Sequence, residues 1–195
     1  MSNDSIRQEI SESITVRQAI LADDALVEQL AEAAEVCVAA YRRGNKILLA
    51  GNGGSAADAQ HLAAEFVNRY AIERPGLSAI ALTTDTSVLT SIANDCGYED
   101  VFARQLEANG AEGDVFIAIT TSGNSPNILA ALKEANKVGI KTIGLAGATG
   151  GAMQQYCDYC LRVPSERVSR VQEAHIMLGH IICGLVESAV FSGAE

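Results

Sequence analysis

Two residues that can bind a metal ion or transfer a proton, His61 and Glu65, stand four positions apart. In a helix this spacing puts them on one face, about 40° apart around the axis, so they can share a metal ion or a substrate. The alternative is a solvated polar pair, which is the commoner case on helices. The neighbouring positions are rich in alanine, which favours a lined cleft.

The chain has only three histidines, His61, His175 and His180. The last two are five positions apart on one predicted helix, about 140° around its axis, so we expect one of them to be structural. Gln172 and His180 are separated by about 12 Å of helix rise, too far for easy chelation of one ion. If both serve one site, that site draws on more than one subunit.

The loop Gly51-Asn52-Gly53-Gly54-Ser55 is the first of two loops that could bind a ligand. It lacks the Gly-Lys-Ser/Thr of a phosphate-binding P-loop and the glycine spacing of a dinucleotide site, which disfavours nucleotide binding. Its glycines allow close approach of the backbone to a ligand, and Ser55 can cap the next helix. The alternative is a tight strand-to-helix turn without a ligand.

The second loop, Thr120-Thr121-Ser122-Gly123-Asn124-Ser125, gathers hydroxyl groups directly before Pro126. Proline suits the first position of a helix, so a helix N-terminus is predicted here. Backbone N–H groups and the helix dipole favour an anion, to which the hydroxyls can donate hydrogen bonds. The loop is therefore a candidate phosphate site, with an ordinary capped helix start as the alternative.

The elements that must position these residues alternate between short aliphatic runs and helical stretches. That alternation indicates a parallel sheet covered on both faces, with ligands beyond the carboxyl ends of the strands. Strands are predicted over 46–50, 78–82, 114–119, 141–145 and 158–163. Helices are predicted over 4–21, 24–43, 55–69, 86–94, 101–109, 126–138 and 167–191, with a short one near Met153. The last helix is apolar enough to be a candidate for packing against another subunit.

Composition limits the range of functions. With 195 residues, 48% hydrophobic, the chain has the size and apolar content of one domain. A net charge of −10 opposes binding to nucleic acid or an anionic membrane, so an anionic substrate needs a local trap. No signal peptide and no apolar run as long as a membrane span are predicted, and we expect a cytoplasmic protein.

The five cysteines are odd in number and irregularly spaced, so a disulfide framework is not expected. Cys157 and Cys160 have the spacing of a metal or redox pair, but no second pair completes a zinc site. We interpret them as small apolar residues beside a strand.

Long ordered blocks of the sequence resemble the sugar isomerase (SIS) family, specifically the phosphoheptose (sedoheptulose 7-phosphate) isomerases. The resemblance runs nearly end to end. The blocks are GNGGSAADAQHLAAEF at 51–66, ALTTDTSVLTSIANDCGYEDVFARQ at 81–105, TTSGNSPNI at 120–128 and VQEAHIMLGH at 171–180.

The resemblance implies one SIS domain over 1–195 with a flavodoxin-like five-stranded parallel sheet. It also implies a homotetramer, to which the helices of residues 1–43 contribute. One zinc ion per subunit would be held at positions matching His61, Glu65, Gln172 and His180, and Glu65 and His180 match the catalytic pair. The implied substrate-binding residues are Asn52, Gly53, Gly54, Glu65, Asn94, Asp95, Thr120, Thr121, Ser122, Ser125 and Gln172.

The implied reaction converts D-sedoheptulose 7-phosphate to D-glycero-D-manno-heptose 7-phosphate through an enediol, for heptose and lipopolysaccharide precursors. A carboxylate and an imidazole can share the proton transfers that this requires. Two alternatives remain. One is a non-catalytic SIS protein that associates with the replication initiator DnaA. SIS proteins of that type lack the glutamate and the final histidine that match Glu65 and His180. The other is an isomerase of another ketose phosphate.

Overall fold

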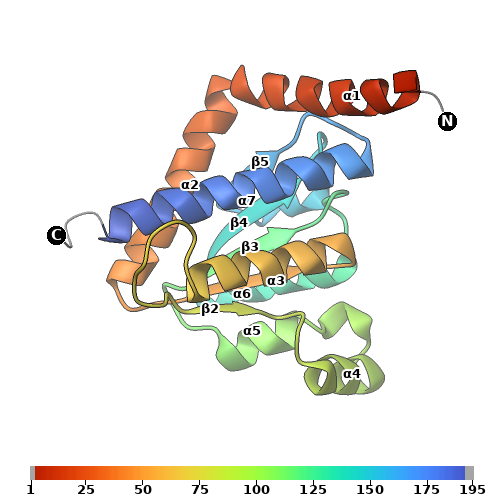
Figure 1. Ribbon diagram of the computed structural model, residues 1–195. Helices are drawn as coiled ribbons and strands as arrows, with labels where there is room; N and C mark the ends of the chain where they lie inside the picture. The colour runs from red at the N-terminus through yellow and green to blue at the C-terminus, as the bar shows by residue number, and fades with distance from the viewer. Residues whose placement is uncertain (1–2, 192–195) are drawn as a thin grey trace.

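The computed structural model describes residues 3–191 and contains one five-stranded parallel sheet (Figure 1). The strands are β1 (Ile47–Gly51), β2 (Ala79–Ala81), β3 (Val115–Ile119), β4 (Lys141–Ala146) and β5 (Tyr159–Arg162). They lie in the order β2-β1-β3-β4-β5 and every neighbouring pair is parallel. This is the flavodoxin-like arrangement, so the predicted fold class is confirmed, with strand ends within a residue or two of prediction.

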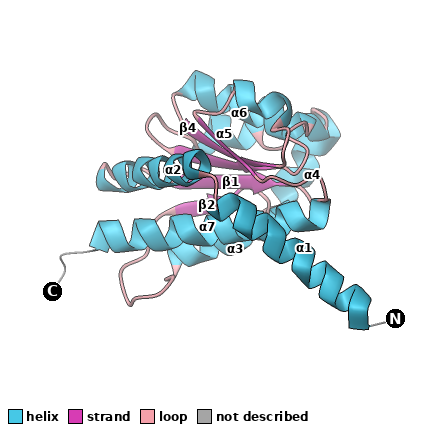
Figure 2. Cartoon of the chain, turned by 90° about the horizontal axis from the view of Figure 1, so that it is seen from above, coloured by secondary structure: helices cyan, strands magenta, loops and turns pink. Residues whose placement is uncertain are grey.

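Helices cover both faces of the sheet, as Figure 2 shows with the sheet seen nearly edge-on. One core joins the sheet to α2, α3 and α7, and the other joins it to α5 and α6. The α-helices are α1 (Asn3–Leu21), α2 (Asp24–Arg42), α3 (Gly54–Val67), α4 (Thr86–Asp95), α5 (Ala103–Asn109), α6 (Pro126–Val138) and α7 (Val168–Phe191). Two short 3₁₀ helices are η1 (Tyr98–Asp100) and η2 (Gly151–Gln155).

The central strands β1 and β3 are apolar throughout because both of their faces are buried. Ile47 and Leu49 of β1 pack into the core with α2, α3 and α7, whereas Leu48 and Ala50 pack into the opposite core. All four are fully buried. Alternate side chains of a strand point to opposite faces, so a strand covered on both sides is apolar at nearly every position.

Polar caps fix several helix ends at the predicted places. The Asp23 side chain accepts a hydrogen bond from the Leu26 N–H at the start of α2, and Asp85 does the same for Val88 at the start of α4. Gly44 follows the end of α2 with φ +81°, a conformation that favours glycine. The predicted stop at Gly44 is confirmed.

The expectation that no apolar run is as long as a membrane span is wrong for α7. By length and composition alone, this 24-residue helix could cross a membrane. It packs instead against α2 and α3 and buries side chains that include Leu178, Ile182 and Val186. A core helix of a globular domain passes the same test of length and apolarity, so this finding gives weak evidence for a membrane span.

Both edge strands are short, three residues in β2 and four in β5. The helix α1 projects past the rest of the body before the N-terminal end of α2 (Figure 2), and its Glu9 and Glu12 form ion pairs with Arg167 just before α7. Its Ile6, Ile10 and Ile14 are each about half exposed, at 55%, 56% and 49%. These three residues form an apolar stripe on α1 that the described part of a single chain leaves uncovered.

All five cysteines are free thiols, as expected for a chain without a disulfide framework. Cys157 and Cys160 are both partly buried at the start of β5. A hydrogen bond between the two thiols raises the pKa of Cys157 and lowers that of Cys160. Both pack against the core formed with α5 and α6, which agrees with the interpretation as small apolar residues.

Candidate active site

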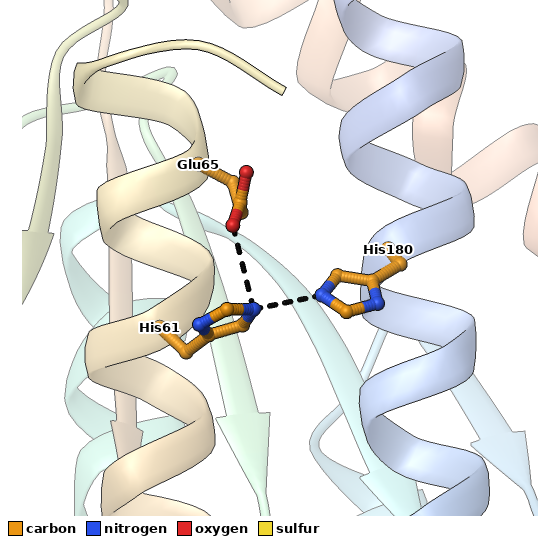
Figure 3. A group of neighbouring side chains, drawn as sticks. All are labelled: His61, Glu65 and His180. Atoms are coloured by element: carbon orange, nitrogen blue, oxygen red, sulfur yellow. Dashed lines mark hydrogen bonds and ion pairs between the residues drawn. The ribbon is translucent and has the colours of Figure 1, made fainter. Parts of the chain in front are cut away.

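Helices α3 and α7 lie side by side on one face of the sheet and bring His61, Glu65 and His180 together (Figure 3). The Nε2 atoms of His61 and His180 are 2.8 Å apart, and His61 Nε2 lies 3.4 Å from Glu65 Oε1. The interpretation of His61 and Glu65 as a pair facing a shared site is therefore supported by a third group from a distant part of the sequence.

This trio forms a candidate metal centre. One ligand atom from each residue lies within 4.8 Å of the other two. Two imidazole nitrogens and a carboxylate oxygen are ligands that suit zinc, and three protein ligands leave a further position open, as in catalytic zinc sites. Tetrahedral ligands at zinc distances are roughly 3.3 Å apart, so a small outward movement of the two imidazoles would admit the ion. The donor set therefore fits the predicted zinc.

The surroundings of the trio are partly apolar and partly acidic. The Tyr70 ring lies against His180, with ring centroids 5.8 Å apart. Asp58 stands one turn before His61 on α3; burial raises its pKa, while the charges of His61 and His180 oppose that shift. The His61 side chain is 50% exposed and that of Glu65 21%. The trio therefore faces outward, where a ligand or a second chain can reach it.

Gln172 does not join the trio in a single chain. Its carboxamide lies at the start of α3, where a Cβ on Gly54 would stand 2.5 Å from Gln172 Nε2. His61 is seven residues further along α3, about 10 Å of helix rise away. This separation agrees with the expectation that Gln172 and His180 do not chelate one ion within one subunit.

His175 lies in the core rather than in the site. It is fully buried, and burial lowers the pKa of its imidazole to about 4. Neither ring nitrogen has a hydrogen-bond partner that meets normal geometry among the described residues. His175 is thus the structural histidine of the pair, as predicted, and His180 is the one in the site.

The loop 120–125 turns its hydroxyls toward one another at the carboxyl end of β3. Thr120 Oγ1 lies 2.9 Å from Ser125 Oγ and 3.4 Å from Ser122 Oγ. The Ser125 side chain makes no capping bond to α6 and pairs with Thr120 instead. Gly123 has φ +66°, and a Cβ there would collide with the Gly150 carbonyl. The loop therefore gathers three hydroxyl groups before the start of α6 and packs on the turn 147–151.

Asn52 is held beside that loop by neighbours that the sequence did not single out. The Asn52 and Asn127 side chains exchange two hydrogen bonds of 2.9 and 2.8 Å, and the Tyr98 hydroxyl donates to Asn52 Oδ1 at 3.2 Å. A cavity of about 440 Å³ lies here, lined by Asn52, Tyr98, Glu99, Ser125, Pro126 and Asn127. In the sequence Asn127 gave only a weak signal, as a polar residue directly after the helix-starting proline.

Of the other predicted substrate residues, the structure places Gly53, Gly54 and Thr121 at the carboxyl edge of the sheet, and Asn94 and Asp95 on α4. Gly53 and Gly54 open α3, and Gly53 has φ +55°. Thr121 follows Thr120, and its carbonyl accepts a hydrogen bond from the Gly147 N–H. Asn94 and Asp95 lie exposed at the end of α4, where Asn94 donates to Asp95 at 2.7 Å. In the described residues this last pair makes no hydrogen bond to the loop 120–125 or to the trio.

Comparisons with known proteins agree on one family. The sequence model described as SIS domain matches residues 12–147. The phosphoheptose isomerase of Aneurinibacillus thermoaerophilus is 59% identical over 97% of this chain and 96% of its own. Phosphoheptose isomerase 2 of Campylobacter jejuni is 56% identical over 97% and 94%.

Solved structures are similar over the same length. The phosphoheptose isomerase of Neisseria gonorrhoeae aligns with a TM-score of 0.89 and 42% identity, covering 95% of this chain and 98% of its own. That of Francisella tularensis aligns with a TM-score of 0.91 and 38% identity, covering 96% and 100%. More distant neighbours at 16–21% identity show the shared fold alone.

Proposed function

The chain belongs to the SIS domain family, and from that premise we propose that it isomerises D-sedoheptulose 7-phosphate to D-glycero-D-manno-heptose 7-phosphate. The coarser assignment, an aldose–ketose isomerase acting on a sugar phosphate in heptose biosynthesis, follows from relatives named phosphoheptose isomerase that are 51–59% identical over nearly the whole chain. The finer assignment depends on the residues of the site.

The observation that carries the proposal is the meeting of Glu65 and His180 around His61. A carboxylate and an imidazole at one place provide the two groups that moving a proton between adjacent carbons requires. The trio also argues against a non-catalytic SIS protein of the type that associates with DnaA, because that type lacks the matching glutamate and final histidine.

In the proposed reaction, Glu65 takes the proton from C1 of the ketose as its carbonyl at C2 becomes an enediol hydroxyl. His180 supplies the proton to the C2 oxygen and takes one from the C1 hydroxyl, so the C1 aldehyde forms as Glu65 returns a proton to C2. No proton or electron is gained or lost overall. Each group alternates between acid and base, which a carboxylate and an imidazole can do near neutral pH.

We infer that His61, Glu65 and His180 hold a zinc ion, one per subunit, and that Gln172 of a second copy of the chain completes its ligands. When bound, such an ion polarises a carbonyl oxygen and stabilises negative charge on it. The position of Gln172 about two helix turns from His61 supports a contribution from another copy. The chain's own trio supplies the other three ligands.

The phosphate is held in this proposal by the loop 120–125, through hydroxyls of Thr120, Ser122 and Ser125 and through backbone N–H groups at the start of α6. Thr121, Asn52, Gly53 and Gly54 lie at the same edge of the sheet and would bind the sugar. Asn94 and Asp95 would join them from α4. A local trap of this kind is needed because the whole chain carries a charge of −10.

Assembly into a homotetramer is supported by apolar side chains that one chain leaves exposed. Besides the stripe on α1, Ile181 and Leu185 of α7 are 39% and 45% exposed beside His180. Contiguous exposed apolar side chains are typical of interaction sites. We further propose a cytoplasmic enzyme whose product serves heptose units of lipopolysaccharide.

The test is turnover of sedoheptulose 7-phosphate by the purified protein with added zinc, beside Glu65→Gln and His180→Ala. Loss of a general acid or base typically lowers the rate about 10²–10⁴-fold, so both variants should fall in that range. If the parent protein were no faster than the variants, the enzyme proposal would be abandoned.

A panel of pentulose, hexulose and heptulose phosphates compared by kcat/KM tests the choice of substrate. The heptulose 7-phosphate should be preferred. A preference for a five- or six-carbon sugar would refute the heptose assignment while leaving an isomerase of another ketose phosphate.

A further inference from the structure

A buried ion pair lies behind the His61–Glu65–His180 trio, between α7 and the segment 68–76 that follows α3. Arg74 Nε donates to Glu187 Oε2 at 2.9 Å, and the two side chains are only 2% and 4% exposed. The two residues are 113 positions apart in the sequence. Burying two charges is costly unless every polar atom of the pair finds a partner.

The Glu187 carboxylate finds its partners in the backbone of segment 68–76. It accepts hydrogen bonds from the N–H groups of Tyr70, Ala71 and Ile72 at 2.8, 2.7 and 3.1 Å. These bonds and the Arg74 guanidinium lower the pKa of Glu187 to about 2 against the cost of burial. Three successive N–H groups directed at one carboxylate fix the path of this segment against α7.

Arg74 connects the same carboxylate to the end of α3. Its Nη2 donates to the Glu65 carbonyl at 2.8 Å and its Nη1 to the Phe66 carbonyl at 2.6 Å. The last carbonyls of a helix lack partners within the helix, and a cation there is favourable. Arg74 therefore completes the turn of α3 that carries Glu65.

Tyr70 connects the ion pair to His180. His180, Gly184 and Glu187 lie on one face of α7, because seven residues make almost two full turns. The Tyr70 ring lies over Gly184, where a Cβ would stand 3.1 Å from Cε1 of the ring, and it also contacts His180. The segment fixed by Glu187 thus places a ring against the imidazole of His180.

We propose that Glu187 and Arg74 are positioning residues, which hold the Glu65 turn of α3 and the Tyr70 ring so that Glu65 and His180 meet in working geometry. Neither residue is assigned a contact with the substrate. Both act through the backbone of the residues that are assigned one or through the ring of Tyr70. This proposal rests on the proposed function, since it explains how the same site is kept in place.

The experiment uses the full chain with Glu187→Gln, and with Glu73→Gln as the matched control. Glu73 lies in the same segment but pairs with Arg69 at the surface, where its side chain is 90% exposed. Gln has the size of Glu, but its NH₂ group is a hydrogen-bond donor. It cannot accept the hydrogen bonds that the N–H groups of segment 68–76 donate to the Glu187 carboxylate. Zn²⁺ affinity is measured by competition with a chelator. The kinetic constants kcat and KM are measured with sedoheptulose 7-phosphate as the substrate.

Glu187→Gln should weaken Zn²⁺ binding at least tenfold and lower kcat at least tenfold with KM within about threefold, the range typical of residues that orient metal ligands. Glu73→Gln should leave both within about twofold of the parent protein. Faster hydrogen exchange of the amides at 70–72 in Glu187→Gln would show that the intended bonds were lost. Unchanged Zn²⁺ affinity and kcat despite that faster exchange would overturn the proposal.

Arg74→Lys serves if Glu187→Gln does not fold. Lysine keeps the charge beside Glu187 but cannot donate to Glu187 and both α3 carbonyls in the planar pattern of arginine. It should lower kcat and Zn²⁺ affinity in the same way, and parent-like values for a folded Arg74→Lys protein would count against the proposal. A parent protein that neither binds Zn²⁺ nor turns over the sugar would refute the proposed function itself, which is a different result.

Discussion

Replacing Gly54 with alanine should separate the activity of the protein from its stability. A Cβ at this position would lie 2.5 Å from Gln172 Nε2, about 1 Å closer than ordinary contact, and 3.2 Å from its Cδ. The atoms in the way belong to the end of a flexible side chain, so the backbone of α3 can stay in place while the Gln172 carboxamide moves.

The two effects on stability nearly cancel. Alanine at a helical position gains up to about 1 kcal/mol over glycine. Forcing Gln172 away from its preferred rotamer costs about 0.5–1.5 kcal/mol. We expect a net change within about 1 kcal/mol, which for a chain of this size moves Tm by no more than about 2–4 °C.

The effect on activity should be much larger. Displacing a substrate or metal contact by about 1 Å can cost up to 10²-fold in rate, so kcat/KM of Gly54→Ala on sedoheptulose 7-phosphate should fall at least tenfold. The assay is steady-state kinetics with thermal unfolding measured on the same preparations. It includes Gln172→Ala and the double variant.

The double variant decides whether the effect passes through Gln172. If it does, Gly54→Ala should change kcat/KM by less than about twofold once Gln172 is alanine, because interacting sites are not additive. An equal loss of kcat/KM in both backgrounds would refute this reasoning. So would a loss of several degrees in Tm, since it would show that the backbone of α3 had moved.

Three further outcomes are expected. Gly123→Ala should destabilise the protein by about 3 kcal/mol or more in chemical unfolding, because φ +66° disfavours alanine and the Gly150 carbonyl that its Cβ would meet is backbone; a cost below about 1 kcal/mol would contradict the described turn. The pKa of Glu187 is about 2 against an ordinary 4.5, so ionised Glu187 stabilises the fold above pH 4.5 and this contribution is lost as pH falls toward 2. The free energy of unfolding of Glu187→Gln should therefore depend less on pH between 4.5 and 2 than that of the parent protein. An equal pH dependence of the two proteins would contradict this role of Glu187. The pKa of His175 is lowered to about 4 from 6.5, so His175 takes up a proton more readily in the unfolded chain. The free energy of unfolding should therefore decline by about 3 kcal/mol as pH falls from 6.5 to 4. His175→Leu should remove that decline in urea unfolding measured over the same pH range.

The sequence predicted the sheet and its helices because their signals are local. After their first residues, Lys46 and Asp114, runs such as KILLA and DVFIAI are apolar at every position, as is typical of strands buried on both faces. The stop at Gly44 and the helix start at Pro126 were likewise set by single residues whose backbone preferences are strong. The lengths of elements such as β2 differ from prediction, because contacts with neighbouring elements decide them, and the 3₁₀ helix η1 was not predicted.

The site was predicted less completely, because its parts come from distant segments. The spacing of His61 and Glu65 put them on one face, but nothing local in the sequence placed His180 opposite them; only the family resemblance implied it. The two contacts of Arg74, with Glu187 and with the end of α3, gave no pattern at all. Such contacts depend on which helices become neighbours in the folded protein. A hydrophobic pattern shows which face of a helix is buried, but it does not show which helix packs against that face.

The two short edge strands limit how copies of this chain can join. A strand of three or four residues offers too few free backbone groups for another chain to extend the sheet by edge pairing, which also guards against fibre-like aggregation. If copies of the chain associate, the exposed side chains of helices and loops therefore offer the larger contact surface. In such an assembly a substitution on the outer surface of α3 or α7 would change the activity of the neighbouring molecule's site as well as that of its own.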